Sequence, residues 1–150
     1  MKVVIQRVLE ASVKIDGKIN GEIKKGFMIL AGFVAEDTKE DLTWTAGKIS
    51  GLRIFDDKDG VMNLSLKDVD GDILLISQFT LHALTKKGNR PSYVMAAKPE
   101  IAEPLYESFI KILEETIGKK VQTGIFGADM KVSLINDGPV TIIIDSKNRL

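Results

Sequence analysis

The chain has 150 residues, of which 44% are hydrophobic and 28% charged, and this size and composition fit a single globular domain spanning residues 1–150. Its 21 basic residues balance 21 acidic ones, so no overall charge steers it toward a polyanion, and any contact with nucleic acid must be local. It contains no cysteine, which excludes disulfide bonds and thiolate catalysis.

Short apolar segments rich in β-branched residues recur along the chain and predict strands. They are Val3–Val8, Ala11–Ile15, Phe27–Phe33, Ile73–Phe79, Val132–Ile135 and Val140–Ile144. The first two segments are close enough in sequence to suggest a hairpin. The run Ile73–Ile76 is continuously apolar, which predicts a strand buried on both faces.

Helical spacing appears in two other parts of the chain. Thr38–Asp41 resembles a capping box, and apolar residues follow it at three- and four-residue steps. A second helix is predicted from Pro99 to a stop at Gly118. Its apolar stripe is expected to be Ala102, Leu105, Phe109, Ile112 and Thr116. Many strands with two helices and no strict alternation predict an α+β fold with a strongly curved, barrel-like β-sheet.

The sequence gives no sign of export or membrane insertion. Polar residues interrupt the N-terminal segment too early for the apolar core of a signal peptide. The longest apolar run, Gly26–Ala35, has roughly half of the ~20 residues that a membrane span needs. We therefore expect a cytoplasmic protein that makes no membrane contact.

The inventory of reactive side chains excludes several common catalytic centres. His82 is the only histidine, so a Ser-His-Asp triad would have to use it as the base. Placed two residues beyond a strand, it is expected to be a solvated surface residue. A zinc site of His and Cys ligands is excluded by count, and the usual glycine-rich nucleotide loops are missing. We expect neither a metal nor a cofactor.

A cluster of uncharged polar residues, Ser77–Leu81, ends the buried strand. On a strand, Gln78 and Thr80 would share one face, and Ser77 and Phe79 the other. Hydroxyl and amide groups there can orient a ligand, and backbone N–H groups freed at the strand end can stabilise an oxyanion. The other interpretation is that the strand simply ends in a polar turn.

A second cluster, Asn136–Thr141, lies between the last two predicted strands. Its Asn-Asp-Gly-Pro sequence is strong turn chemistry, so the pattern alone favours a plain hairpin connection. Nothing in composition or periodicity indicates an unusual peptide isomer in this turn.

Together, Ser77–Leu81 and Asn136–Thr141 resemble the two signature motifs of the D-aminoacyl-tRNA deacylases. Other segments resemble the same family and occur in the same order: Met1–Val8, Leu52–Phe55, Met62–Leu66, Lys87–Ser92 and Phe126–Met130. The resemblance covers essentially the whole chain. It implies a homodimeric hydrolase that cuts the ester bond between tRNA and a D-amino acid, as chiral proofreading in translation.

The resemblance also implies a gate for chirality. The Gly138–Pro139 peptide is expected to be cis and to reach across the dimer into the partner's active site, where its carbonyls exclude L-residues. Asn136, in the same motif, is placed with the substrate-binding residues. Glycine has no side chain to exclude, so glycyl-tRNA mischarged on tRNA(Ala) is expected as a second substrate.

Three further roles follow from the resemblance. Arg7 is expected to help hold the Gly-Pro motif, Phe126 to lie near the pocket for the 3′-terminal adenosine of tRNA, and Met130 to sit beside the Gly-Pro element.

The catalytic role that the resemblance implies falls on Ser77, Gln78, Phe79 and Thr80. Thr80 has no evident base in the sequence, so we favour it, with the backbone near Phe79, as a positioning and oxyanion element rather than a nucleophile. The ribose 2′-hydroxyl of the substrate is then expected to help activate water or the leaving group.

Two other functions are compatible with the same residues. One is a non-catalytic tRNA-binding module whose phosphate contacts are the basic patches Lys24–Lys25, Lys86–Arg90 and Lys119–Lys120. The other is a small-molecule esterase that uses the polar cluster Ser77–Leu81.

Overall fold

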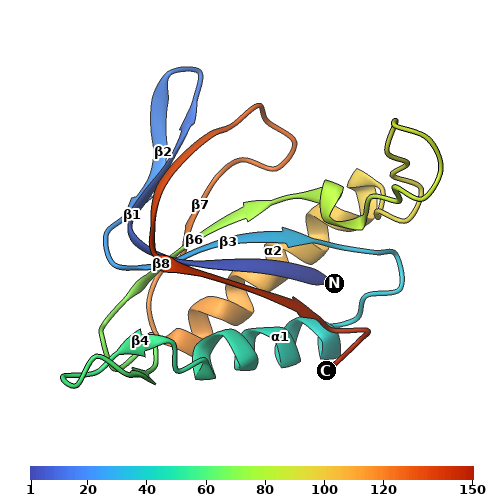
Figure 1. The fold of residues 1–150 in the computed structure, drawn as a ribbon. Helices are drawn as coiled ribbons and strands as arrows, with labels where there is room; N and C mark the ends of the chain where they lie inside the picture. Colours follow the sequence, from blue (N-terminus) through green and yellow to red (C-terminus); the bar gives the residue numbers. More distant parts are fainter.

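The computed structural model describes residues 1–150 and shows two helices packed on one face of a strongly bent mixed β-sheet (Figure 1). The strands are β1 (Lys2–Ile15), β2 (Lys18–Ile23), β3 (Gly26–Gly32), β4 (Phe55–Asp56), β5 (Met62–Leu64), β6 (Asp72–Ser77), β7 (Gln122–Thr123) and β8 (Lys131–Asp145). The helical elements are α1 (Lys39–Gly51), the 3-10 helix η1 (Phe79–His82) and α2 (Pro99–Ile117). The predicted α+β class with a barrel-like sheet is confirmed.

The main sheet has the order β2-β1-β3-β6-β7, and β8 pairs with the other edge of β1. β3, β6 and β7 run parallel, whereas β1 is antiparallel to β2, β3 and β8. The Asn20 side chain on β2 donates a hydrogen bond to the carbonyl of Thr123 on β7, at 2.7 Å. The two ends of the sheet order therefore approach each other and nearly close the barrel.

β1 is one continuous strand, and the hairpin predicted between Val8 and Ala11 is wrong. The intervening Leu9–Glu10 contains neither Gly nor Pro, so the chain continues instead of reversing. It reverses at Asp16–Gly17, where both residues have positive φ (51° and 77°), as a tight hairpin turn requires. β1 can therefore pair along its length with several partners.

β8 is also one continuous strand, and the hairpin predicted at Asn136–Thr141 is wrong. Both halves of β8 pair antiparallel with β1, from Lys131 opposite Lys14 to Asp145 opposite Lys2, with irregular register around Val8. Proline has no N–H to give to the ladder, so within a strand it sits at such irregularities. The Gly138–Pro139 peptide is cis, which confirms that expectation.

The helices begin and end near their predicted boundaries. Thr38 N donates to Asp41 Oδ2 at 2.9 Å, which caps α1. α2 starts at Pro99 and stops at Gly118, which has a left-handed φ of 74°. The buried stripe of α2 differs from the predicted one: its members are Ala102, Tyr106, Phe109 and Leu113. Tyr106 can be buried in this stripe because its hydroxyl finds a partner: it donates to the carbonyl of Leu75 at 2.9 Å.

Apolar side chains fill both faces of the central strands. On β6, Ile73 and Leu75 join the core beneath the helices, whereas Leu74 and Ile76 join a second cluster inside the curved half of the sheet. This alternation confirms that the run Ile73–Ile76 is buried on both faces. Neither helix is both long and apolar enough to cross a membrane.

Candidate active site

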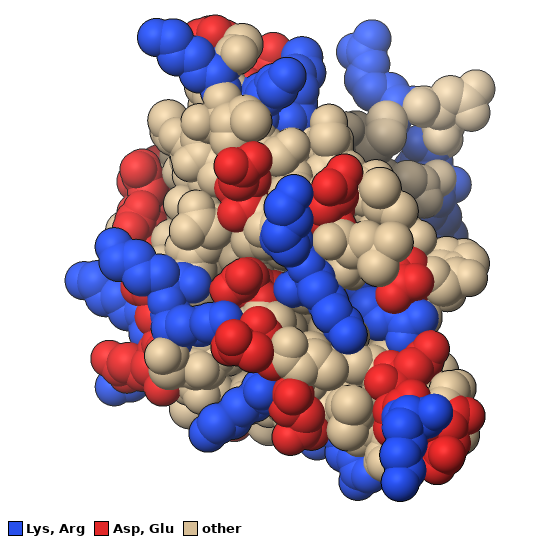
Figure 2. Space-filling model, turned by 90° about the vertical axis from the view of Figure 1, so that its left-hand side faces the viewer, with Lys and Arg blue, Asp and Glu red and all other residues tan.

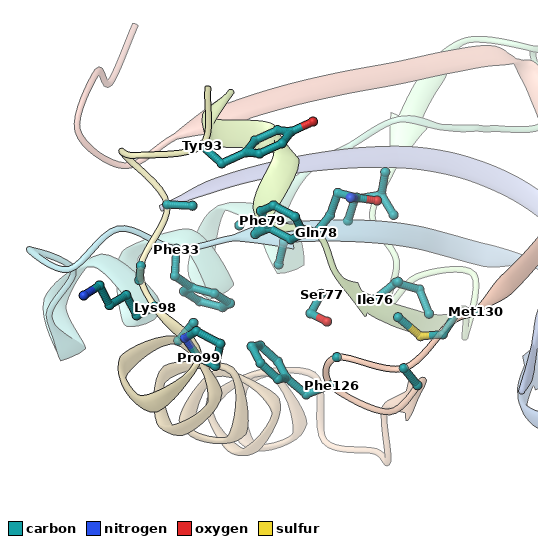
Figure 3. Close-up of a pocket in the computed structure, with 18 of the residues that line it drawn as sticks. Phe33, Ile76, Ser77, Gln78, Phe79, Tyr93, Lys98, Pro99, Phe126 and Met130 are labelled. Atoms are coloured by element: carbon teal, nitrogen blue, oxygen red, sulfur yellow. The ribbon is translucent and has the colours of Figure 1, made fainter. Parts of the chain in front are cut away.

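A cavity of about 570 Å³ lies where the carboxyl ends of β3 and β6 meet the start of α2 (Figure 3). These two strands are parallel, so both end at the same edge of the sheet, where ligands commonly bind in open α/β sheets. Most of the lining is apolar, with Phe33 and Phe126 facing Ser77 across the space. The cavity has the character of a site for a partly apolar ligand held by a few polar groups.

The polar cluster after β6 forms part of the cavity wall. Ser77 ends the strand, and Phe79 begins η1, so the predicted alternation of faces stops at Ser77. Ser77, Gln78 and Phe79 line the cavity, and Thr80 lies directly behind them in the chain. Gln78 Nε2 donates to Thr80 Oγ1 at 2.6 Å. Because the hydroxyl oxygen accepts this bond, the Thr80 hydrogen remains free to be donated elsewhere.

The same turn leaves backbone donors unused. The hydrogen bonds of η1 begin where Leu81 N donates to Gln78 O at 3.3 Å, followed by Ala83 N to Thr80 O at 3.0 Å. The N–H groups of Phe79 and Thr80 precede the first of these bonds, as the leading N–H groups of any helix do. Two adjacent N–H groups near a hydroxyl are the kind of donors that an oxyanion hole uses.

His82 is buried, with an exposed fraction of 8%, so its predicted place on the surface is wrong. Its ring packs close to Gly32, and its Nε2 atom has no hydrogen-bond partner. Burial is the main cause that lowers the pKa of His82, and the nearby N-terminus and Lys2 lower it further. The ring hydrogen-bonds to the backbone of Gly32, and no serine or threonine hydroxyl bonds to it, so no Ser/Thr-His pair is formed.

A second group of residues lies on β1 and β8, outside the cavity wall. The buried Arg7 donates from Nε to the carbonyl of Asp137 at 2.9 Å and from Nη1 to the carbonyl of Ile54 at 2.7 Å. Asn136 Oδ1 accepts a hydrogen bond from Val140 N at 2.8 Å. These contacts fix the chain on both sides of Gly138 and Pro139, which are themselves exposed.

The structure therefore divides the sequence-derived site residues into two groups. The first group lines the cavity and consists of Ser77, Gln78, Phe79, Phe126 and Met130. The other group is Arg7, Asn136, Gly138 and Pro139, with Thr80 next to the cavity but not in its wall. Within one chain, Met130 directly precedes β8 and does not lie beside Pro139.

The cavity wall also contains residues to which the sequence gave no role, namely Phe33, Tyr93 and Lys98. Phe33 follows β3 at the same sheet edge as Ser77. That shared position is the one sequence feature that could have indicated its place in the cavity wall. Tyr93 stands edge-on to Phe79, with ring centroids 5.1 Å apart. Its contact with Phe79 depends on how the long segment between η1 and α2 folds back.

Comparison with known proteins shows the family of the chain. The protein-family model described as D-Tyr-tRNA(Tyr) deacylase matches residues 4–145. The chain belongs to this deacylase family. A D-aminoacyl-tRNA deacylase of Flavobacterium psychrophilum is 68% identical over 99% of both chains, and one of Bacteroides fragilis is 63% identical over the same share.

Solved structures share the deacylase fold. One described as a c-Myc DNA Unwinding Element Binding Protein has a TM-score of 0.92 and 41% identity, over 97% of this chain and 98% of that one. Another, described as a probable eukaryotic D-amino acid tRNA deacylase, has a TM-score of 0.83 at 18% identity, over 95% and 97%. At that identity, the second likeness supports the fold alone.

In this deacylase, Gly32 is the point where β3 touches η1. A Cβ atom at Gly32 would lie 2.7 Å from the Gln78 carbonyl oxygen and 3.2 Å from the His82 ring, so η1 must move to accept one. We expect Gly32→Ala to lower kcat/KM for the family's substrate roughly 10- to 100-fold, because small displacements of catalytic groups are costly. Steady-state kinetics with circular dichroism measure activity and folding together.

The matched control is Gly47→Ala in α1, where a Cβ meets no atom within 4 Å. Alanine is the better helix former, so this variant should fold at least as stably and keep full activity. Wild-type activity in Gly32→Ala would show that the position of η1 does not matter to catalysis.

Proposed function

We propose that the chain hydrolyses the ester bond of D-aminoacyl-tRNA to free D-amino acid and tRNA, in the cytoplasm, where its substrate is made. The observation that carries this proposal is the pair of unused N–H groups at Phe79 and Thr80, beside a cavity of about 570 Å³. Family membership and relatives up to 68% identical, which are D-aminoacyl-tRNA deacylases, support the choice of substrate.

The chemistry needs little from the protein because an aminoacyl ester is already activated. Water attacks the ester carbonyl, and the N–H groups of Phe79 and Thr80, with the Thr80 hydroxyl, stabilise the oxyanion that forms. The carboxylate in the cavity wall, Asp129, is paired with Lys131 at 2.9 Å. We therefore assign proton transfer to the ribose 2′-hydroxyl of the substrate, with the protein supplying position.

The cavity has room for more than the ester. Phe126 lines it and packs against Tyr106, with ring centroids 5.9 Å apart. Burial raises the pKa of Tyr106, so its hydroxyl stays protonated and keeps its bond to Leu75. This rigid aromatic pair is suited to hold the 3′-terminal adenosine of tRNA by stacking.

The chirality gate requires a second copy of the chain. Gly138 and Pro139 are exposed and do not line the cavity of their own chain, so in an isologous homodimer they can complete the partner's cavity. Exposed apolar residues on the same strand, Ile135 and Ile143, provide surface for that contact. Met130, at the cavity, would then lie beside the Gly-Pro element of the partner.

A gate of main-chain carbonyls selects by exclusion, because it reads no particular side chain. An L-residue would drive its Cβ substituent into the gate, whereas a D-residue directs it away. Glycine passes, so glycyl-tRNA mischarged on tRNA(Ala) is a second substrate of the proposed site.

A role in nucleic-acid binding without catalysis is the main competing function. It is favoured by the solved relative at 41% identity, whose description names binding to a DNA unwinding element. The second competing function is that of a small-molecule esterase that uses the same cavity.

Hydrolysis assays with matched substrates distinguish these functions. We expect the purified protein to release free amino acid from several chemically different D-aminoacyl-tRNAs, to spare their L-counterparts and to leave free D-amino acid methyl esters intact. A binding module would release nothing from any of them. An esterase would cleave the methyl esters as readily as the tRNA esters, and either result would refute the proposal.

A further inference from the structure

The segment Leu84–Lys98, which joins η1 to α2, is a local basic surface in a chain with no net charge. It contains Lys86, Lys87, Arg90 and Lys98 and no acidic residue. These basic residues are exposed, and none of them takes part in an ion pair. Their charge is therefore available to a partner.

The tip of this segment, with Lys86, Lys87 and Arg90 and here called the basic tip, is fixed next to the cavity. Leu84 and Ser92 exchange backbone hydrogen bonds of 2.8 and 2.9 Å, which close the base of the loop that carries Lys86, Lys87 and Arg90. Directly after this bridge, Tyr93 lines the cavity. In Figure 1 the loop projects from the body at the right, beyond the ends of β3 and β6. A polymer that leaves the cavity on this side must pass the loop.

In each of the other two basic pairs, Lys24–Lys25 and Lys119–Lys120, one lysine is held in an ion pair. Lys24 pairs with Glu10 at 3.7 Å, and Lys119 with Asp70 and Asp72 at 3.0 and 2.9 Å. They belong to the β2–β3 turn and to the end of α2, at the opposite side of the molecule (Figure 1). Figure 2 views the molecule from that side and shows basic and acidic residues interleaved. That face therefore offers no surface of a single charge.

Exposed aromatic rings accompany the basic tip. Phe79 and Tyr93, with exposed fractions of 54% and 41%, stand edge to face at the cavity. Cationic side chains that follow a phosphate backbone, next to aromatic rings that stack on bases, are the recurring means of binding single-stranded nucleic acid.

We infer that Lys86, Lys87 and Arg90 bind the phosphates of the single-stranded 3′ end of the RNA substrate, just before the terminal nucleoside that enters the cavity. This inference rests on the proposed function. It adds the surface by which the protein distinguishes its tRNA substrate from an ester without phosphates. The loop supplies affinity for the strand, and the cavity supplies the chemistry.

The test compares two substrates over a range of monovalent salt concentrations: D-aminoacyl-tRNA, and D-aminoacyl-adenosine, which has no phosphate. The variant is the triple Lys86→Gln, Lys87→Gln, Arg90→Gln. With tRNA we expect its kcat/KM to fall on the order of 10²-fold at low salt, and the slope of log(kcat/KM) against log[salt] to become less negative by about 2. With D-aminoacyl-adenosine it should match the wild type.

The matched control replaces three exposed lysines in connections that do not line the cavity, Lys58, Lys67 and Lys120, by glutamine, and should keep the wild-type salt slope. The inference is overturned if the loop variant keeps the wild-type slope with tRNA, or if it loses activity equally on both substrates. If the wild-type protein hydrolyses neither substrate, the proposed function itself fails and takes this inference with it.

Discussion

Thr80→Ala is expected to lower kcat for D-aminoacyl-tRNA by roughly 10²–10³-fold, the usual cost of removing one oxyanion donor. The Thr80 hydroxyl accepts a hydrogen bond from Gln78 at 2.6 Å and so points its own hydrogen away from Gln78. An oxyanion exists only in the transition state. The variant should therefore lose kcat and kcat/KM equally while KM stays unchanged.

Two further variants separate a donor from a nucleophile. Thr80→Ser keeps the hydroxyl and should retain most of the activity, whereas Thr80→Val keeps the shape and should behave like Thr80→Ala. Rapid quenching followed by mass spectrometry of the protein detects any covalent ester on Thr80. Trapping such an ester during turnover would show that Thr80 attacks the substrate and that the assigned oxyanion role is wrong.

Local chemistry explains why parts of this fold were predictable. Three predicted features depend only on residues close in sequence: the capping contact of Thr38 with Asp41, the start of α2 at Pro99 and its stop at Gly118. The alternation of Ile73–Ile76 between two clusters likewise follows from a strand with no polar face. Such features need no knowledge of distant partners.

The errors came from elements whose conformation depends on long-range pairing. Asn136–Thr141 has turn chemistry, yet β1 supplies ladder partners to both sides of it, so the strand continues through Pro139. β2 (Lys18–Ile23) is polar and largely exposed, so it carries no strand pattern and was not predicted. β4, β5 and β7 are too short to show a period.

The candidate site was only partly predictable, for the same reason. The Ser77–Thr80 motif is contiguous, but its companions Phe33, Tyr93 and Phe126 come from three separate connections that meet only in the folded chain. The burial of His82 beneath Gly32 is likewise a tertiary effect.

Gly138→Ala is expected to abolish the D-over-L preference or to lower activity more than about 10²-fold through loss of the gate. Gly138 has a φ of 135°, a region that essentially only glycine adopts, at a cost of about 1–3 kcal/mol for other residues. An added Cβ would lie 2.8 Å from Val140 Cγ2 and 3.3 Å from Arg7 Nη2. The segment from Asp137 to Pro139 must move, and the carbonyls of the proposed gate move with it.

Gly17→Ala is the matched control, because Gly17 also has a positive φ, 77°, but a Cβ there meets no atom within 4 Å. It should lose a comparable amount of stability in thermal unfolding and keep both activity and chiral preference. Wild-type activity and preference in Gly138→Ala would place the gate elsewhere, even though the chain belongs to the deacylase family.

Where Gly138→Ala lowers activity, mixing it with Thr80→Ala tests whether the proposed gate acts across the dimer. If Thr80 of one chain works with Gly138 of its partner, a mixed dimer of Thr80→Ala and Gly138→Ala chains has one site with both substitutions and one site with neither. After subunit exchange at equal amounts, about half of the dimers are mixed and half of their sites are intact, so about a quarter of wild-type activity should return. If Thr80 and Gly138 served the same site from the same chain, every site would carry one substitution and the mixture would stay inactive.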